Sequence, residues 1–206
     1  SGGSSSGGNE GGNGGSGIVT GNTGTGTYNG SEQKVEGYTT SISDPLYKES
    51  DFAFSGTAEA GGTNAGTYNM GLEASQFTNN NKNFDVTFNV TDGSMVIGRK
   101  AVTVTANDSS KTEGGADPTL TATVTGLVGD DTISYDISRT NGETPGTYVI
   151  SVTGDEIQGN YDVTFVDGTF TINEAPAPDD DPTPTPGGGG GNPGGGGPAV
   201  TPAGPV

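Results

Sequence analysis

Apolar and polar residues alternate along several stretches of the central part of the chain. The longest stretch covers residues 84–91 (FDVTFNVT), and the same alternation recurs at 120–125, 148–152 and 161–165. A period of two, with β-branched and aromatic residues at the apolar positions, is typical of half-buried antiparallel strands. No stretch carries the 3.6-residue period of an amphipathic helix. We therefore predict an all-β fold.

Asp–Gly pairs separate some of these stretches. Asp92-Gly93 and Asp167-Gly168 each lie between two alternating segments. Asp–Gly between two strands is a common signal for a tight β-hairpin, so we predict that each pair closes a hairpin between the last two strands of a domain.

The two ends of the chain differ in composition from its centre. Residues 1–26 and 175–206 together hold 22 of the 40 glycines and 9 of the 12 prolines, but none of the 14 Phe and Tyr residues. The first segment, rich in Gly, Ser and Asn, is typical of a flexible linker, whereas the alternating prolines and glycine runs of the second favour a disordered, extended spacer. The predicted folded part is therefore 27–174.

Two halves of the folded part match each other. The segments AGTY (65–68), NFDVTF (83–88) and DGSMVI (92–97) recur as PGTY (145–148), NYDVTF (160–165) and DGTFTI (167–172). An offset that drifts from 80 to 75 residues is expected when only loops change length. We predict two tandem antiparallel β-domains, 27–98 and 99–174, joined near Gly98-Arg99 by a junction short enough to limit bending.

Composition excludes several kinds of function. The chain has no His and no Cys, which excludes Ser-His-Asp and Cys-His catalysis, zinc fingers and disulfide scaffolds. Seven Lys and Arg against 25 Asp and Glu, a net charge of −18, argue against a nucleic-acid-binding surface. No apolar run approaches the ~20 residues that span a bilayer. Paired carboxylates could serve a glycosidase, but Trp, the usual sugar-stacking residue, is absent. We predict that the chain is not an enzyme, and assign no catalytic, cofactor-binding or metal-binding residue and no cofactor.

Acidic segments remain open as calcium sites, because Ca²⁺ prefers oxygen ligands. The candidates are Asp130-Asp131, Asp155-Glu156 and Asp179-Asp180-Asp181. None has the D-x-D-x-D-G spacing of an EF-hand. Solvated turn residues are the alternative interpretation, and the one we favour.

Two further hypotheses concern side chains of the folded part. An amide crosslink could join Lys34 or Lys100 to an Asn or Asp; Asn83 and Asn160 are equivalent in the two copies, but no equivalent lysine accompanies both. A carbohydrate platform could form from aromatic residues in the less regular part of the first copy. Its candidates are Tyr38, Tyr47, Phe52 and Phe54, although the Phe52-Ala53-Phe54 alternation also fits core packing.

The second copy resembles the MBG repeats of the YGX type. The resemblance rests on KTEGGADPTL at 111–120, GTY at 146–148, NYDVTF at 160–165 and GTFTI at 168–172. Glu113 stands where that motif usually has Tyr. The first copy, opening TYNGSEQ at 27–33, is similar to a related class that often precedes or alternates with it.

The resemblance implies large secreted or cell-wall-attached bacterial proteins, commonly adhesin-like, and supplies no catalytic residues. We expect a structural stalk of a bacterial extracellular surface protein, whose partners are neighbouring domains of a larger parent protein. The alternatives are an adhesin module that binds a glycan or host protein, and a subunit of a self-assembling filament. We expect no nucleic-acid partner and no membrane insertion within this segment.

Overall fold

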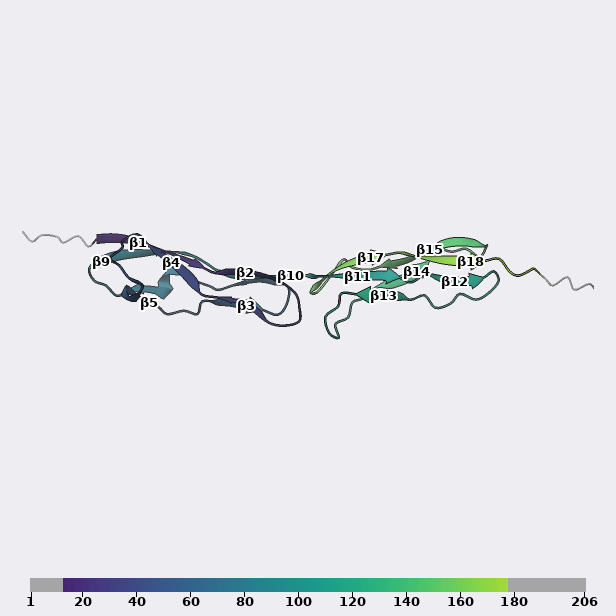
Figure 1. Cartoon of the computed structure of the whole chain (residues 1–206), viewed down its shortest axis with the longest axis horizontal. Coiled ribbons are helices and arrows are strands. Elements are labelled where there is room, and N and C mark those ends of the chain that lie inside the picture. Colours follow the sequence, from purple (N-terminus) through teal and green to yellow (C-terminus); the bar gives the residue numbers. More distant parts are fainter. Residues whose placement is uncertain (1–12, 178–206) are drawn as a thin grey trace, which may run out of the picture. The chain divides into compact units, whose positions relative to one another are not determined.

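A computed structural model describes residues 13–177 and confirms the all-β fold (Figure 1). The remaining structured segments are two single 3₁₀ turns, Glu49–Asp51 and Ala74–Gln76. Within the described range, no helix is long and apolar enough to cross a bilayer.

The strands fall into two domains, and only Arg99 separates the last strand of the first domain from the first strand of the second. The strands of the first domain are β1 (Asn13–Gly21), β2 (Thr23–Thr27), β3 (Gln33–Glu36), β4 (Tyr38–Ile42), β5 (Phe52–Phe54), β6 (Glu59–Gly62), β7 (Gly66–Asn69), β8 (Phe77–Asn79), β9 (Phe84–Thr91) and β10 (Ser94–Gly98). Those of the second are β11 (Lys100–Ala106), β12 (Ser109–Thr112), β13 (Ala122–Thr125), β14 (Asp136–Arg139), β15 (Gly146–Thr153), β16 (Ile157–Gln158), β17 (Tyr161–Val166) and β18 (Gly168–Asn173).

Each domain contains two main sheets that share the same order of three strands, and in the second domain each sheet has one further strand, β16 or β14. The first domain has sheets ordered β4–β1–β9 and β2–β10–β7, and the second has β13–β11–β17–β16 and β12–β18–β15–β14. Two short pairs, β3–β6 and β5–β8, complete the first domain. The equivalence of β1, β2, β9 and β10 with β11, β12, β17 and β18 gives the internal repeat a structural basis.

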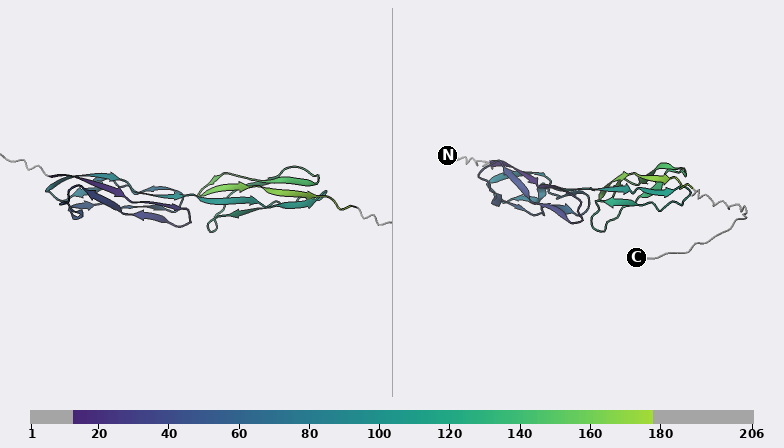
Figure 2. Two further views of the ribbon diagram at one scale, coloured as in Figure 1. Left: turned by 45° about the horizontal axis from the view of Figure 1, so that its top comes forward. Right: turned by 45° about the vertical axis from the view of Figure 1, so that its right-hand side comes forward.

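The opening and closing strands of each domain pair in parallel. β1 runs parallel to β9 and β2 to β10, and in the second domain β11 runs parallel to β17 and β12 to β18 (Figures 1 and 2). The sheets are therefore mixed, whereas the alternation predicted antiparallel strands. A period of two shows which face of the sheet a side chain occupies. Parallel and antiparallel strands have the same period, so the alternation cannot distinguish parallel from antiparallel pairing.

The linker predicted for residues 1–26 is wrong from residue 13 onward. Strand β1 lies at the centre of its sheet, between β4 and β9, and Val19 on it is fully buried. The glycines that suggested a linker occur where the chain packs closely: a Cβ on Gly24 would lie 2.7 Å from the sulfur of Met95, and one on Gly21 would lie 2.3 Å from the backbone nitrogen of Gly93. Residues 1–12 and most of the predicted spacer (178–206) lie outside the described residues.

The two predicted Asp–Gly hairpins are also wrong. Neither β9 with β10 nor β17 with β18 forms a pair, because the chain passes at Asp92-Gly93 and Asp167-Gly168 from one sheet of the domain to the other. The aspartates hold these crossings: Oδ1 of Asp92 accepts from the backbone N–H of Leu72 at 2.9 Å, and Oδ1 of Asp167 accepts from that of Val152 at 3.2 Å. The glycine is required by close approach, since a Cβ on Gly168 would lie 2.6 Å from the carbonyl oxygen of Ala106.

The buried side chains come from the alternating positions of the predicted strands. In the second domain the core includes Val102, Val104, Ile150, Phe170 and Ile172, each at most 2% exposed. The first domain contributes to the same cluster through Met95 and Ile97 at one end, and has a separate aromatic cluster at the other. Burying these apolar side chains supplies the main stabilisation of such thin domains.

Candidate functional site at the domain junction

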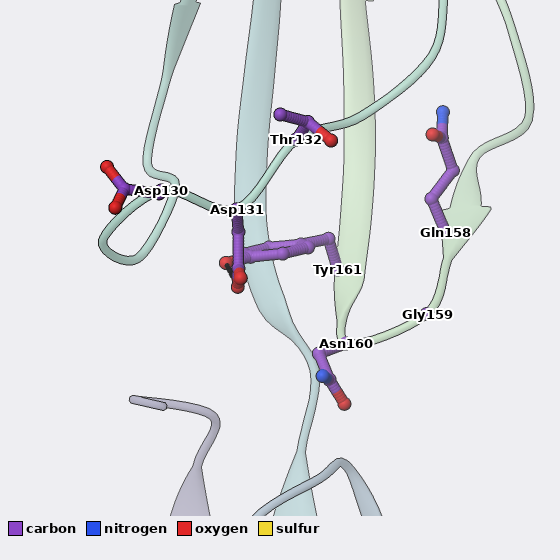
Figure 3. Close-up of a pocket in the computed structure, with 7 residues that line it drawn as sticks. All are labelled: Asp130, Asp131, Thr132, Gln158, Gly159, Asn160 and Tyr161. Carbon is purple, nitrogen blue, oxygen red and sulfur yellow. Dashed lines mark hydrogen bonds between the residues drawn. The ribbon is translucent and has the colours of Figure 1, made fainter. Parts of the chain in front are cut away.

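Two tyrosines and one aspartate join the domains. Tyr28 follows β2 in the first domain, and its hydroxyl donates to Oδ2 of Asp131 at 2.8 Å. Tyr161, the first residue of β17, donates to the same oxygen at 2.5 Å. The two rings meet edge to face, with centroids 5.5 Å apart. Figure 3 shows the Asp131 carboxylate beside Tyr161, with the side chain of Asp130 pointing away.

The environment favours an ionised Asp131. Hydrogen bonds from Tyr161 and then Tyr28 lower the pKa of the Asp131 carboxyl. The pKa of the Tyr28 phenol is raised mainly by its hydrogen bond to Asp131, and that of Tyr161 by burial and then by the same bond. Tyr28 and Tyr161 are only 7% and 4% exposed. The carboxylate is thus a charged acceptor shared by two buried donors, an arrangement stronger than a neutral hydrogen bond.

Asn160 makes a second set of contacts across the junction. Its Oδ1 accepts from the backbone N–H of Ala65 at 2.8 Å, and its Nδ2 donates to Oδ1 of Asn64 at 3.0 Å. The connecting residue is also held, because Nε of Arg99 donates to the carbonyl of Gly159 at 3.1 Å. The Asn160 bonds link the β6–β7 loop of the first domain to the turn before β17 in the second, and the Arg99 bond holds the connecting residue to the same turn.

A shallow pocket of about 510 Å³ opens beside the Asp131 carboxylate. It is lined by Asp130, Asp131, Thr132, Gln158, Gly159, Asn160 and Tyr161. These residues offer hydroxyl, amide and carboxylate groups but no nucleophile paired with a base. Among residues 13–177, no three Asp or Glu side chains gather closely enough to hold a metal ion.

The calcium candidates occupy different surroundings. Asp131 is committed to the two tyrosine hydroxyls, and Asp130, Asp155 and Glu156 are exposed. The third candidate, residues 179–181, lies outside the described part of the chain.

A second charged cluster lies within the second domain. Lys111, whose side chain is 5% exposed, contacts Asp117 at 2.7 Å and also Glu143. Arg139 forms a two-point pair with Asp117 at 2.6 and 3.1 Å, and its guanidinium lies 4.7 Å from the centre of the Phe170 ring. Arg139 and then Lys111 lower the pKa of Asp117 to about 2.

The Lys34 and Asn160 side chains, two of the crosslink candidates, have other partners. Lys34 is 46% exposed and pairs with Glu36 and Glu59 at 2.5 and 3.2 Å, while the side chain of Asn160 is engaged with the first domain. Asn83 is exposed. Lys100 begins β11, and its backbone N–H donates to the carbonyl of Asn160 at 2.9 Å.

Sequence reasoning missed the buried lysine, Lys111. Its ammonium pKa is raised, first by Asp117, and Asp117 is held ionised. Amide formation needs a neutral amine, so this cluster is an ion-pair network. The only sequence feature that marks Lys111 is its position as the first residue of the YGX-type segment at 111–120.

The structure brings three of the four candidate platform residues together and buries the fourth, Tyr47. Tyr47 is 4% exposed, and its hydroxyl donates to Asn79. Tyr38 and Phe54 stand edge to face at 5.1 Å and both pack on Phe77. Phe52 packs on the same cluster. Tyr38, Phe52 and Phe54 are half-buried against the core residues Phe77 and Phe88, and with Glu49 they line a pocket of about 370 Å³.

Comparison with protein families agrees with the repeat. Residues 16–99 match the MBG domain, and residues 102–171 match the MBG domain of the YGX type. No curated protein and no solved structure matched the chain. The first match begins within β1, in the segment that composition alone assigned to a linker. The chain therefore carries two tandem MBG-type domains, the second of the YGX type.

Proposed function

We propose that the two MBG domains are a spacer in a bacterial extracellular surface protein, where they hold neighbouring domains away from the cell. The observation that carries this proposal is the junction. A flexible join needs several unbonded residues. Here a single residue, Arg99, connects the two domains, and its side chain is itself hydrogen-bonded to the second domain.

Side-chain contacts support a fixed angle between the domains. Tyr28 binds Asp131, and Asn160 binds both Asn64 and the backbone of Ala65. The Tyr28 bond and the two Asn160 bonds cross from one domain to the other at two places, so a bend that separates the domains at either place breaks hydrogen bonds there. A pair that keeps its angle sets a defined length, which is what a spacer requires.

Charge suits the proposed location. A net charge of −18 disfavours self-association and collapse onto an envelope that is also negative. Salt screens this repulsion over about 10 Å at 0.1 M. An extracellular location on the cell surface or in the cell wall is part of the proposal, as is the absence of catalysis.

The alternative is an adhesin module, and one observation favours it. The polar pocket beside Asp131 presents the exposed side chains of Asp130 and Thr132, a carboxylate and a hydroxyl that can bond sugar hydroxyls. Binding of the full chain to an array of glycans and matrix proteins, with and without Ca²⁺, separates the two functions. Specific, competable binding would establish recognition, and a folded monomer that binds nothing would favour the spacer.

The spacer proposal is tested by the distance between the domains. The chain has no cysteine, so Ser41→Cys in β4 and Thr153→Cys in β15, both exposed, can be spin-labelled specifically in the full chain. We expect one narrow distance peak. Tyr28→Ala together with Asn160→Ala should broaden it, because both sets of side-chain contacts are lost.

The matched control is Tyr148→Phe. It removes a tyrosine hydroxyl that bonds only Thr144 of the same domain, so the distance peak should stay narrow. A broad distribution in the unsubstituted chain would contradict the fixed junction and, with it, the spacer function.

A further inference from the structure

The carboxyl-terminal ends of the two domains can be compared residue by residue. β2 ends beside Gly98 of β10, and the next residue, Tyr28, donates its backbone N–H to the Gly98 carbonyl. β12 ends beside Asn173 of β18 in the same way, and Glu113 donates to the Asn173 carbonyl. Glu113 therefore occupies the position of Tyr28, and Glu174 that of Arg99.

The loop before β7 has the same counterpart before β15. Gly66 pairs with Ile97 and Gly146 with Ile172, the residues that precede Gly98 and Asn173. The hydroxyl of Tyr68 donates to the Asn64 carbonyl at 2.9 Å, and that of Tyr148 donates to the Thr144 carbonyl at 2.8 Å. Thr144 and Pro145 thus occupy the positions of Asn64 and Ala65.

The four residues that form the junction hydrogen bonds from the side of the first domain, Tyr28, Asn64, Ala65 and Arg99, are all replaced at the equivalent positions of the second domain. Tyr28 and Arg99 become the exposed acids Glu113 and Glu174. Ala65 becomes Pro145, which has no N–H to donate. Asn64, whose side-chain oxygen accepts from Asn160, becomes Thr144.

We infer that these four positions determine which domain end can dock a following MBG domain, and that the second domain carries the non-docking set. The carboxyl-terminal end of the first domain docks on a surface that presents an ionised Asp131, Tyr161 and Asn160. This inference rests on the junction contacts and holds whether the pair is a spacer or an adhesin.

Electrostatics make the substituted end unfavourable for the same partner. At the junction a neutral phenol, Tyr28, meets the Asp131 carboxylate. Glu113 at that position would bring a second carboxylate against the first, and like charges at hydrogen-bond distance repel. Arg99, a cation, donates a hydrogen bond to the carbonyl of Gly159. Glu174 occupies the equivalent position, and its ionised carboxylate can only accept hydrogen bonds.

The amino-terminal end of the first domain also differs from its counterpart. Phe84 opens β9 as Tyr161 opens β17, and pairs with the first residue of the domain's opening strand. It has no hydroxyl to share with a carboxylate. Within residues 13–177, the complementary surfaces described here therefore occur together only at the junction around Arg99.

The test is a chain in which a second copy of residues 100–174 is inserted directly after Glu174. The copy presents its own equivalents of Asp131, Asn160 and Tyr161 to the end of the second domain. Spin labels at Thr153→Cys in the second domain and at Thr125→Cys in the copy report the new junction. We expect a broad distance distribution, in contrast to the narrow peak between the first and second domains.

Four substitutions in the second domain should convert its end into a docking surface: Glu113→Tyr, Thr144→Asn, Pro145→Ala and Glu174→Arg. The expected result is loss of the broad distribution and appearance of a single narrow peak. If the fourfold variant unfolds, Glu113→Tyr with Glu174→Arg changes only exposed residues and should narrow the distribution part of the way.

The reciprocal variant uses the natural two-domain chain. Tyr28→Glu with Arg99→Glu should broaden the peak, whereas the conservative pair Tyr28→Phe with Arg99→Lys should broaden it less. A narrow peak in the unsubstituted three-domain chain would overturn the inference. So would a reciprocal variant that is folded and keeps the natural peak.

Discussion

Ile150→Ala should selectively destabilise the second domain. Ile150 is fully buried on β15, beside Gly168 of β18 and Arg139 of β14. The substitution removes three carbons, worth about 0.8 kcal/mol each in transfer free energy, and leaves a cavity. We expect a loss of about 3 kcal/mol in the free energy of unfolding, within the usual range of ~2–5 kcal/mol.

That loss is large for so small a domain. A domain of about 75 residues has a total stability of roughly 4–11 kcal/mol. With an unfolding entropy of about 2.1 cal/mol/K per residue, the midpoint of its thermal transition should fall by roughly 20 °C. Calorimetry of the full chain measures this, because the transition of the first domain should stay near its original temperature.

The neighbouring residue is the control. Val149 lies on the same strand, faces the other way and is 47% exposed. Val149→Ala should change the stability by at most about 0.5 kcal/mol. Equal losses for the two variants, or a loss below about 1 kcal/mol for Ile150→Ala, would refute the assignment of the buried face of β15.

Three further predictions concern an ion pair, a glycine and the opening strands. The Asp117 pKa is lowered to about 2 from an ordinary value near 3.8, so the stability it contributes is present above about pH 4 and lost as pH falls toward 2; urea midpoints of the second domain should fall over that interval, and fall less in Asp117→Asn. Gly142→Ala should destabilise the second domain by about 1–3 kcal/mol, because the new Cβ would lie 2.0 Å from the Tyr148 ring, and a thermal midpoint equal to that of the parent chain would contradict this. Deleting residues 1–27 should unfold the first domain and spare the second, since β1 and β2 belong to its two main sheets; a chain that keeps the amide NMR dispersion of both domains would restore the linker interpretation.

Alternation predicted the strands whose apolar side chains are large. Phe88, Ile150, Val163 and Phe170 all occupy apolar positions in the predicted strands and are buried. The alternation did not predict β1 and β2, because several of their inward-facing or closely packed positions are glycines. A glycine-rich composition is typical of a flexible linker. A glycine can stand where nothing packs against the chain, or where a neighbouring strand packs too closely for a side chain. The partner strand decides which, and that strand is distant in the sequence.

The junction was partly accessible from the sequence. The internal repeat predicts a domain boundary near Gly98-Arg99. Comparison with the YGX-type motif shows Glu113 at a position where that motif usually has Tyr. The contact made by Tyr28, which occupies the position equivalent to Glu113, could not be derived from the sequence. Tyr28 and Asp131 are 103 residues apart and lie in different domains. The sequence predicts Asp131 only as a metal ligand or a turn residue, because it does not show which hydrogen-bond donors reach a carboxylate.

The parallel pairing of opening and closing strands has a mechanical consequence. β1 and β9, like β11 and β17, run in the same direction side by side. Tension between the two ends of a domain pulls such strands lengthwise past each other, so their hydrogen bonds are loaded in shear and must yield together. An antiparallel hairpin at the same place would unzip one bond at a time. Each domain is therefore closed by a clamp that resists stretching along the chain.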